Sequence, residues 1–441
     1  MPSHNVLHFV LDMRILRSYP QWMSATSDTV FVSGTAALCC RDVGWVQMLW
    51  TVVDLFSGCG GMSSGFRRLH EHFKIVGAVD LEAGKPGLGK SAATTTECNS
   101  TYYANIGLRP KKADLRVLDP REYREELGLA PGDLDVLISC APCTGFSQKV
   151  ATNHMRDDPR NTLVERTADF VAELHPEFLV MENVKELLRG NQQHHFRNLQ
   201  DRLHSLNYFV SADVHDLSTF GLPQKRTRAL IIARRDGPIV GLSATIKRPC
   251  TVRDAIGHLP PIEAGEQHPD DLMHMAPRLT TKVFDRVQAI PRDGGSWADI
   301  MNDPYRSEDE KRYLLIPAMF RARRGSFPDV YGRLWWDRPA VTITRECAHV
   351  GNGRYTHPEQ DRLLSVREMA LLQGFPADYV FEGPLTAKYN QIGDAVASMI
   401  AEKIARHIVR IKTEGITAAH EPAERLRQLR LLERNLAYAR A

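Results

Sequence analysis

The sequence predicts an α/β protein built on a doubly wound parallel sheet, with a second, smaller domain. Short apolar segments alternate with helical segments from residue 49 onward, and polar or glycine residues follow each apolar segment. This alternation is typical of parallel strands joined by crossover helices. The length of 441 residues also exceeds that of a typical single domain, which favours a large core with a second lobe.

The predicted strands bring several polar residues to one edge of the sheet. We expect strands at residues 50–56, 75–79, 134–139, 178–181 and 229–233, and helices at 63–70, 162–174 and 367–373. In doubly wound sheets, ligands bind outside the carboxyl ends of the strands. Here those ends carry residues 54–61, Asp80, Cys143 and Glu182. This coincidence is the first indication of a functional site.

Composition divides the chain into five segments. Residues 1–48 contain no lysine and little helical periodicity, so we treat them as an N-terminal extension. Residues 49–240 carry the strand–helix alternation. Residues 241–360 are rich in Pro, Gly, Arg and Trp, which predicts a smaller domain with short strands and long loops. Residues 361–412 return to the large domain, and residues 413–441 are a basic helical tail.

Composition and charge set limits on the class of protein. A hydrophobic content of 43% and a charged content of 25% are ordinary for a soluble globular protein. The net charge of +3 decides little about nucleic acid, because a basic face can coexist with a near-neutral total. We expect no membrane partner, since the chain has no apolar run of about eighteen residues. Asp12, Arg14 and Arg17 interrupt the apolar N-terminal stretch, which argues against a secretory signal.

The eight cysteines indicate a reducing compartment and no metal centre. In a chain of this length without exported features, they are expected to be reduced thiols in the cytoplasm. Their spacing does not favour a zinc site.

Residues 54–61 form a glycine-rich turn between a predicted strand and a predicted helix. Glycine there lets the backbone approach a ligand, and the start of the helix offers N–H groups to an anion. Asp80, 19 residues after Gly61, ends the next apolar segment and can accept both ribose hydroxyls. The turn has neither the GxGxxG pattern nor the Lys-Ser/Thr of a P-loop, which favours a nucleoside without phosphates.

Three further positions are candidates for chemistry, each with a structural alternative. Cys143 lies in a Pro/Gly loop after a strand, as a nucleophilic thiol would, although a buried structural cysteine is commoner. Cys140, nearer the strand, fits the structural role better. Glu182 either caps the next helix or holds a carboxyl group that protonates a ring nitrogen. Arg226 and Arg228 share one strand face, so they either clamp an oxygen and a phosphate or are simply solvated.

In order along the chain, these segments resemble the DNA cytosine-5 methyltransferase family. The resemblance covers residues 52 to about 400, nearly everything after Met48. The motifs are Asp-Leu-Phe-Ser-Gly-Cys-Gly-Gly at 54–61, Pro142-Cys143 with Phe146-Ser147, Glu182-Asn183-Val184, Gln-Lys-Arg-Thr-Arg at 224–228, residues 362–368 with 372–376, and residues 391–396. Six motifs in the right order are hard to obtain by chance.

The resemblance implies S-adenosyl-L-methionine as cofactor and a methyltransferase sheet of the Rossmann-like type. Cys143 would add to C6 of a flipped-out cytosine while Glu182 protonates N3, and Arg228 would bind near O2 with Arg226 supporting the loop. The remaining residues that the resemblance places at the cofactor are Phe56, Ser57, Gly58, Gly60 and Gly61 (methionine), Asp80 (ribose), Leu81 and Asp114 (adenine), and Pro142, Asp394 and Val396.

The resemblance also assigns roles to the segments and names a partner. Residues 49–240 and 361–412 would form the catalytic and cofactor-binding domain, and residues 241–360 the target-recognition domain. The partner would be double-stranded DNA, with a cognate restriction endonuclease as a possible functional partner. We expect a monomer in the cytoplasm, associated with the nucleoid. Candidates for DNA contacts are Arg321, Arg323, Arg324, Trp335, Trp336 and Arg345, although each could instead be a scaffold residue.

The sequence departs from the family pattern at four places. Ser139-Cys140-Ala141 stands where the family usually has Gly-Gly-Pro, Thr144 replaces a common Gln, and Asp394 replaces an Asn. Residues 84–90 look like an insertion after the ribose-binding acid. None of these changes removes a group that the mechanism requires.

Two alternatives remain open. A transfer-RNA cytosine-5 methyltransferase would share the catalytic motifs, but the 133 residues from 229 to 361 favour sequence reading on duplex DNA. A non-catalytic DNA-binding protein on the same fold is disfavoured by the presence of Cys143, Glu182 and Arg228.

Overall fold

The computed structural model describes residues 49–82, 96–142, 157, 159–244, 246, 248–321 and 329–415. The N-terminal extension, Cys143 with Thr144, Phe146 and Ser147, the insertion-like segment 84–90 and most of the basic tail therefore lie outside the described residues. The described ranges contain the whole sheet and most of the predicted site.

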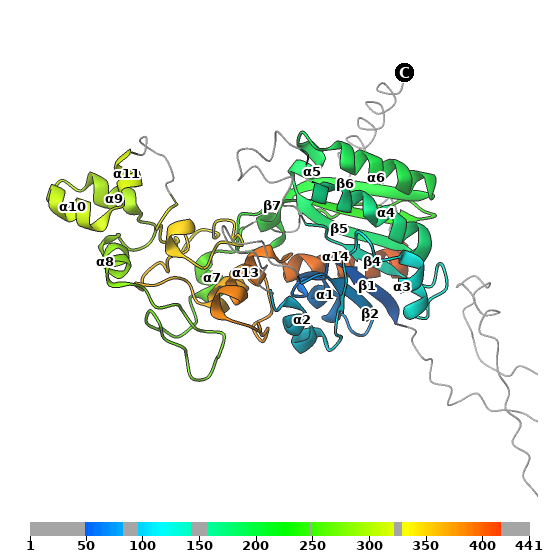
Figure 1. Cartoon of the computed structure of the whole chain (residues 1–441), viewed down its shortest axis with the longest axis horizontal. Helices are drawn as coiled ribbons and strands as arrows, with labels where there is room; N and C mark the ends of the chain where they lie inside the picture. Colours follow the sequence, from blue (N-terminus) through cyan, green and yellow to red (C-terminus); the bar gives the residue numbers. More distant parts are fainter. Residues whose placement is uncertain are drawn as a thin grey trace, which may run out of the picture. The chain divides into compact units, whose positions relative to one another are not determined.

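A seven-stranded sheet forms the centre of residues 49–240 (Figure 1). The strands lie in the order β3-β2-β1-β4-β5-β7-β6. The first five are parallel, and β7 runs antiparallel to both of its neighbours. Their bounds are β1 Trp50–Leu55, β2 Phe73–Asp80, β3 Lys111–Lys112, β4 Val136–Ser139, β5 Phe178–Val184, β6 Tyr208–Asp216 and β7 Thr227–Arg235.

The expected doubly wound sheet is confirmed, but the expectation that every strand is parallel is wrong for β7. Strand β6, which the sequence did not predict, precedes it and is mostly half-exposed, so it has no continuous apolar run. Only the short connection 217–226 joins β6 to β7, and a connection of this length between adjacent strands gives antiparallel pairing. As a result, β7 begins at the edge where the parallel strands end.

Helices cover both faces of the sheet, and alternate residues of each strand face opposite layers. Val53, Leu55, Leu137, Leu179 and Met181 face α3 (Pro120–Glu126), α4 (Thr162–Leu174) and α6 (His194–Ser205). Val52, Val136, Ile138, Phe178 and Val180 face α1 (Gly61–Arg67) and α14 (Ser398–Glu414) (Figure 1). The first and last described helices therefore belong to the same layer.

Where it is described, the segment 241–360 consists mostly of loops with short α-helices between them, so the prediction of short strands there is wrong. It contains α7 Val252–Ile256, α8 Thr281–Ala289, α9 Trp297–Asn302, α10 Glu308–Leu314 and α11 Pro317–Arg321. Its β pairing is limited, among the described residues, to isolated bridges. Capping boxes start α7, α9 and α10, at Thr251 with Asp254, Ser296 with Asp299 and Ser307 with Glu310. Capping boxes are local sequence signals that predict helices, and the prediction of strands here did not use them.

A buried arginine holds this segment together. Arg333 is fully buried and donates hydrogen bonds to the carbonyl oxygens of Val287, Ile290, His357 and Gln360. It also pairs with Asp361. Because buried carbonyl groups need donors, one guanidinium here satisfies four carbonyl groups from two chain segments, 287–290 and 357–360, that no regular sheet connects.

Three more elements link the C-terminal part of the chain to the sheet. They are α2 (Cys98–Ile106), α12 (Val366–Leu372) and α13 (Leu385–Asp394). Ser365 and Glu368 form a capping box at the start of α12, and both carboxylate oxygens of Glu368 also bind Arg362. Burial alone would raise the pKa of Glu368. The hydrogen bonds and the charge of Arg362 outweigh this effect and hold the pKa low, at about 2.

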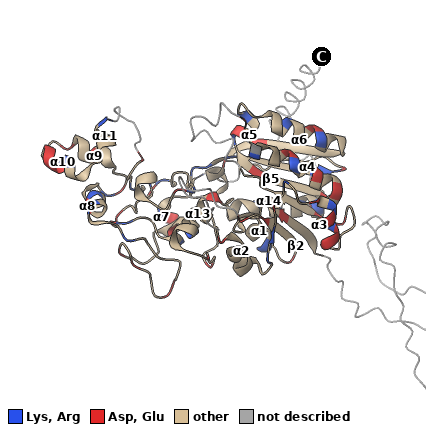
Figure 2. Cartoon of the chain, viewed as in Figure 1, with Lys and Arg blue, Asp and Glu red and all other residues tan. Residues whose placement is uncertain are grey.

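The remaining short helix, α5 (Glu186–Arg189), follows β5. In Figure 2, basic and acidic residues are interspersed along α3, α4 and α6, while acidic residues gather on the first turn of α10. Among the described helices, none is long and apolar enough to cross a membrane.

The close approach of α1 to α14 yields a first prediction. A Cβ atom at Gly65 would lie 2.3 Å from the backbone nitrogen of Glu402, so Gly65→Ala must push the two helices apart. We expect a lower melting temperature and a loss of about 1–3 kcal/mol of stability, although alanine normally favours a helix. The matched control is Arg67→Ala, an exposed change on the same helix. An equal or higher melting temperature for Gly65→Ala would contradict the close packing.

Candidate active site

The residues predicted to form the site lie along the edge of the sheet where the parallel strands end. Strand β1 ends at Leu55, β2 at Asp80 and β4 at Ser139. The antiparallel β7 starts at this edge, where Arg228 pairs with Val184 near the end of β5. Segments that are far apart in the sequence therefore meet at one edge, as expected for a doubly wound fold.

The glycine-rich turn after β1 adopts left-handed backbone conformations. Phe56, Gly58 and Gly60 have φ values of 59°, 51° and 91°. A Cβ atom on Gly58 would meet nothing within 4 Å, so the turn faces open space there. Ser57 is buried, and its hydroxyl oxygen has no hydrogen-bond partner among the described residues. A buried polar atom beside open space is the arrangement expected of a ligand-binding turn.

Asp80 connects this turn to the chain that follows β2. One carboxylate oxygen accepts a hydrogen bond from the backbone N–H of Gly58 at 2.9 Å. The other accepts from the backbone N–H of Glu82 at 2.6 Å and from the thiol of Cys98 at 3.5 Å. The carboxylate is therefore held in one orientation beside the open side of Gly58.

Leu81 and Asp114 both lie close to the backbone of Asp80. Leu81 is an apolar side chain with 42% of its surface exposed, although it directly follows a buried strand. Asp114 follows β3, where the N–H of Ala113 donates to the carbonyl oxygen of Asp80. Hydrogen bonds from Arg116 lower the pKa of Asp114, so this carboxylate is ionised and already paired.

A buried acid, Asp54, joins the strand before the glycine-rich turn to the helix after it. Asp54 accepts a hydrogen bond from the hydroxyl of Ser63 at 2.6 Å, and Ser63 also bonds the hydroxyl of Tyr102. Burial raises the pKa of Asp54 to about 7. Tyr379 donates its hydroxyl proton to the carbonyl oxygen of Cys59 at 2.5 Å. Tyr379 and Tyr102 were not singled out from the sequence, because a buried tyrosine has no local signature of what it will contact.

The chain returns to the glycine-rich turn through residues 391–396. A Cβ atom on Gly61 would lie 2.3 Å from the carbonyl oxygen of Val396, so only glycine allows this approach. Gln391 accepts the thiol hydrogen of Cys59 at its backbone oxygen. Asp394, one of the departures from the family pattern, forms an ion pair with Arg345. The sequence singled out both residues but did not indicate that they pair, since they are 49 positions apart.

Strands β4 and β5 bring Glu182 beside the segment that leads to Cys143. Ile138 pairs with Val180 in register. The side-chain amide of Asn183 then donates to the carbonyl oxygen of Ala141 at 3.1 Å, and the N–H of Glu182 contacts the sulfur of Cys140 at 3.4 Å. Pro142 follows as the last described residue before Cys143 and is exposed. The structure thus shows how Cys140 and Ala141 anchor this segment, while Cys143 itself lies outside the described residues.

The two arginines of β7 differ in their surroundings. Arg228 places its Nε atom 3.0 Å from Oε1 of Glu182 in an ion pair. This oxygen is buried and accepts no well-directed hydrogen bond from the described residues. Arg226 is buried and donates to the carbonyl oxygens of Ile343 and Ala395. Arg228 therefore belongs with Glu182, and Arg226 links three backbone segments around it.

Gln224, to which the sequence assigned no role, connects the backbone segments around Arg226. Gln224 is fully buried and accepts the N–H of Ile343 while donating to the side chain of Gln373. Gln373 donates in turn to the carbonyl oxygen of Ala395 at 2.7 Å. The motifs at 224–228, 372–376 and 391–396 are thus joined by side-chain amides, which explains why they need these residue types.

The candidates for DNA contacts prove to be dissimilar. Trp336 is buried and donates its indole N–H to Glu359, so it is a scaffold residue. Trp335 is half-buried between the guanidinium groups of Arg338 and Arg354. Arg321 is exposed. Arg323 and Arg324 lie outside the described residues.

The burial of Asp54 yields a prediction of pH-dependent stability. From about pH 4 to about pH 7, the unfolded chain has lost the Asp54 proton while the folded chain keeps it, so stability falls as the pH rises. Asp54→Asn cannot ionise, so its free energy of unfolding lacks this fall. We expect the difference in unfolding free energy between the variant and the wild type to shift in favour of the variant by about 2–4 kcal/mol from pH 5 to pH 8. Denaturant unfolding at both pH values measures this difference, with the exposed Asp201→Asn as control. A difference that does not change with pH would contradict the raised pKa.

Comparison with known proteins agrees with this arrangement. The family model described as C-5 cytosine-specific DNA methylase matches residues 50–410. The chain is 34% identical over 378 residues to the Type II methylase M.HgiDII of Herpetosiphon aurantiacus, covering 84% of this chain and 97% of that one. It is 31% identical over 419 residues to the Type II methyltransferase M1.HphI of Haemophilus parahaemolyticus, covering 93% and 98%.

A solved structure has the same fold. A prophage-encoded DNA modification methyltransferase from E. coli superposes with a TM-score of 0.55 at 23% identity, covering 82% of this chain and 99% of that one. The family match spans both the strand-end site and the segment 241–360. The chain therefore belongs to the C-5 cytosine-specific DNA methylase family and is a DNA cytosine-5 methyltransferase.

Proposed function

We propose that this enzyme transfers a methyl group from S-adenosyl-L-methionine to C5 of a cytosine flipped out of a specific duplex sequence. The observation that carries the proposal is the ion pair of the buried Glu182 with the partly buried Arg228, beside the backbone segment that leads to Cys143. A carboxyl group and a guanidinium that converge beside the segment leading to a cysteine suit the N3 and the O2 of a pyrimidine ring whose C6 that cysteine would attack.

The glycine-rich turn fits the proposed cofactor. Open space at Gly58 and the unpartnered hydroxyl of Ser57 suit the polar methionine part, together with Phe56, Gly60 and Gly61. The carboxylate of Asp80, held beside that space, suits the ribose hydroxyls, and the exposed Leu81 offers an apolar surface to the adenine. When bound, S-adenosyl-L-methionine supplies an electrophilic methyl group on a sulfonium.

The other cofactor residues take supporting roles in the proposal. Asp114 would contact the adenine edge while its carboxylate continues to accept hydrogen bonds from Arg116. Val396 would close the wall of the pocket against Gly61. Asp394 would act through its pair with Arg345, and Pro142 would shape the loop between the cofactor and the cytosine.

The chemistry of the pyrimidine explains why these groups are needed together. C5 of cytosine is a poor nucleophile, and addition of the Cys143 thiolate at C6 makes it enamine-like. Glu182 provides the proton at N3, which neutralises the charge that this addition develops. Arg228 keeps the Glu182 carboxyl group aimed at the ring and binds near O2. After methylation, loss of the C5 proton expels the thiolate and restores the aromatic ring.

The segment 241–360 is proposed to read the DNA sequence, and the two flanking segments 49–240 and 361–412 to carry catalysis. Hydrogen bonds from Arg333 join the end of α8 to the loop at residues 357–360. These bonds hold the loops of the segment in place without a sheet. The chain matches two relatives over nearly their full length, and these are named a Type II methylase and a Type II methyltransferase. Their names support a cognate restriction endonuclease as functional partner. We further propose that the enzyme acts as a monomer in the cytoplasm, associated with the nucleoid through its DNA.

The nucleophile assignment predicts the behaviour of a cysteine variant. Cys143→Ala should abolish methyl transfer while S-adenosyl-L-methionine binding persists, because the thiol is needed only for attack on C6. Transfer of labelled methyl groups to duplex DNA and to RNA in parallel measures activity, and calorimetry measures cofactor binding. Cys250→Ala, a partly buried thiol of the segment 241–360, is the control. Full activity of Cys143→Ala would refute the assignment, and label on RNA alone would refute the DNA substrate.

The cofactor assignment makes a separate prediction for Asp80. Asp80→Asn removes the negative charge that accepts the ribose hydroxyls, so we expect cofactor affinity to fall by about 10-fold or more, equivalent to about 1.4 kcal/mol. Equilibrium binding of S-adenosyl-L-methionine measures this effect without requiring turnover. Asp201→Asn, an exposed change on α6, should leave affinity unaltered. Equal affinities of the wild type and Asp80→Asn would exclude Asp80 from the ribose site.

A further inference from the structure

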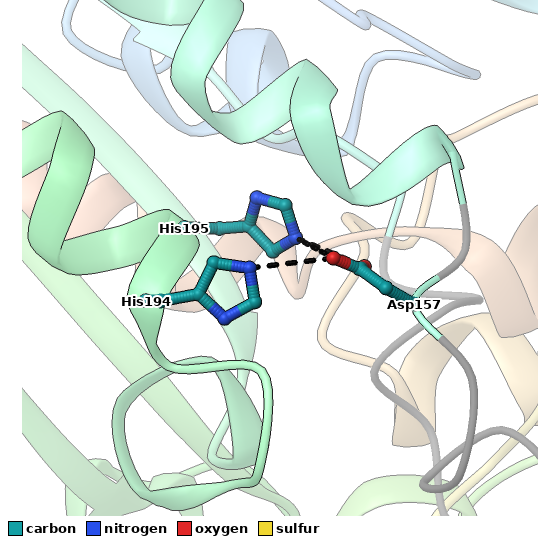
Figure 3. A group of neighbouring side chains, drawn as sticks. All are labelled: Asp157, His194 and His195. Atoms are coloured by element: carbon teal, nitrogen blue, oxygen red, sulfur yellow. Dashed lines mark hydrogen bonds and ion pairs between the residues drawn. The ribbon is translucent and has the colours of Figure 1, made fainter.

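A cluster of two histidines and two acids is formed by Asp157, which precedes α4, Glu165 of α4, and His194 and His195 of α6, and it uses none of the residues assigned to catalysis. Figure 3 shows His194 and His195, which begin α6, with their rings directed toward the carboxylate of Asp157. The Nε2 atom of His195 lies 3.0 Å from both oxygens of Asp157, and Nε2 of His194 lies 3.3 Å from Oδ2. One atom from each of the three residues thus converges on a common point.

The spacing of these atoms matches the ligand shell of a small metal ion. All three ligand atoms lie within 4.8 Å of one another. In a tetrahedral zinc site with bonds of about 2.0–2.1 Å, neighbouring ligand atoms are separated by about 3.3 Å. The two nitrogen–oxygen separations of 3.0 Å and 3.3 Å are close to that value. Only small side-chain adjustments would be needed to accept an ion.

A fourth residue orients one of the histidines. The Nδ1 atom of His195 lies 2.5 Å from Oε1 of Glu165, a residue of α4. Histidines that bind metals commonly donate their second ring N–H to a carboxylate, which fixes the tautomer and leaves Nε2 free to coordinate. Glu165 is placed to accept that N–H, and Nε2 of His195 then faces the point shared with Asp157 and His194.

The cluster combines a fixed ligand with accessible ones. The side chain of His195 is 4% exposed, whereas those of His194 and Asp157 are 49% and 44% exposed. Asp157 also accepts a hydrogen bond from the side-chain amide of Asn161, which holds its carboxylate in place. An ion could therefore reach the cluster from solvent and retain a water molecule in a fourth position.

We propose that Asp157, His194 and His195 form a binding site for a divalent transition metal ion, with zinc as the ion that this ligand set favours. Two imidazoles and one carboxylate suit zinc, while magnesium and calcium require oxygen ligands. The site is structural, and it ties Asp157 to the start of α6. Because it uses none of the residues assigned to methyl transfer, it is independent of the proposed catalytic role of Cys143.

Metal titration of the full-length protein without an affinity tag tests the proposal. After treatment with a chelator and desalting, the protein is titrated with zinc against a chromophoric competitor. We expect one site that His194→Ala weakens by more than 100-fold, and that Glu165→Gln weakens by about 10-fold through loss of the orienting charge. His194 is half-exposed, so its replacement should leave folding intact, which the melting temperature of the metal-free variant verifies.

A matched variant and a spectroscopic readout separate this site from the cysteines. His204→Ala alters an exposed histidine on the same helix and should bind zinc as the wild type does. X-ray absorption of the zinc-loaded protein should show nitrogen and oxygen neighbours at about 2.0–2.1 Å rather than sulfur at about 2.3 Å. No zinc bound in the titration, a sulfur shell, or undiminished binding by His194→Ala would each overturn the proposal.

Discussion

The antiparallel pairing of β7 with β5 is the constraint on which the rest of the site depends. Parallel strands place only their carboxyl ends at the ligand edge, so a sequence motif that precedes a strand would normally lie at the opposite edge. Because β7 is reversed, Arg228 at its start lies beside Glu182 near the end of β5. The same reversal sends Arg226 toward residues 343 and 395, where it joins the later motifs to the sheet.

Much of the catalytic half could be predicted from local patterns. The apolar segments that became β1, β4 and β5 are continuous because both of their faces are buried, so the sequence shows them plainly. Strand β6 was missed because it lies at the edge of the sheet and is largely half-exposed. In the segment 241–360, proline and tryptophan suggested loops and strands, whereas the capping boxes at Ser296 and Ser307 determine the helices observed there.

The sequence predicted which residues gather at the ends of the strands better than it predicted their contacts. A glycine-rich turn and an acid at a strand end are signals within a short window, which is why Gly58 and Asp80 could be identified. Contacts between distant residues have no such signal. The hydroxyl of Tyr379 on Cys59, the pair of Arg345 and Asp394, and the amide chain through Gln224 all span more than forty residues. Each depends on tertiary packing that no local pattern encodes.

The packing of α1 against α14 also governs when the enzyme can become complete during its synthesis. The strand β1 and the helix α1 leave the ribosome early, yet the residues that cover α1 are Ala401, Ile404 and their neighbours near the end of the described chain. Val396, which lies against Gly61, arrives equally late. The edge that carries the glycine-rich turn is therefore complete only once residue 396 has been made, and a product that stops before residue 396 lacks one wall of it.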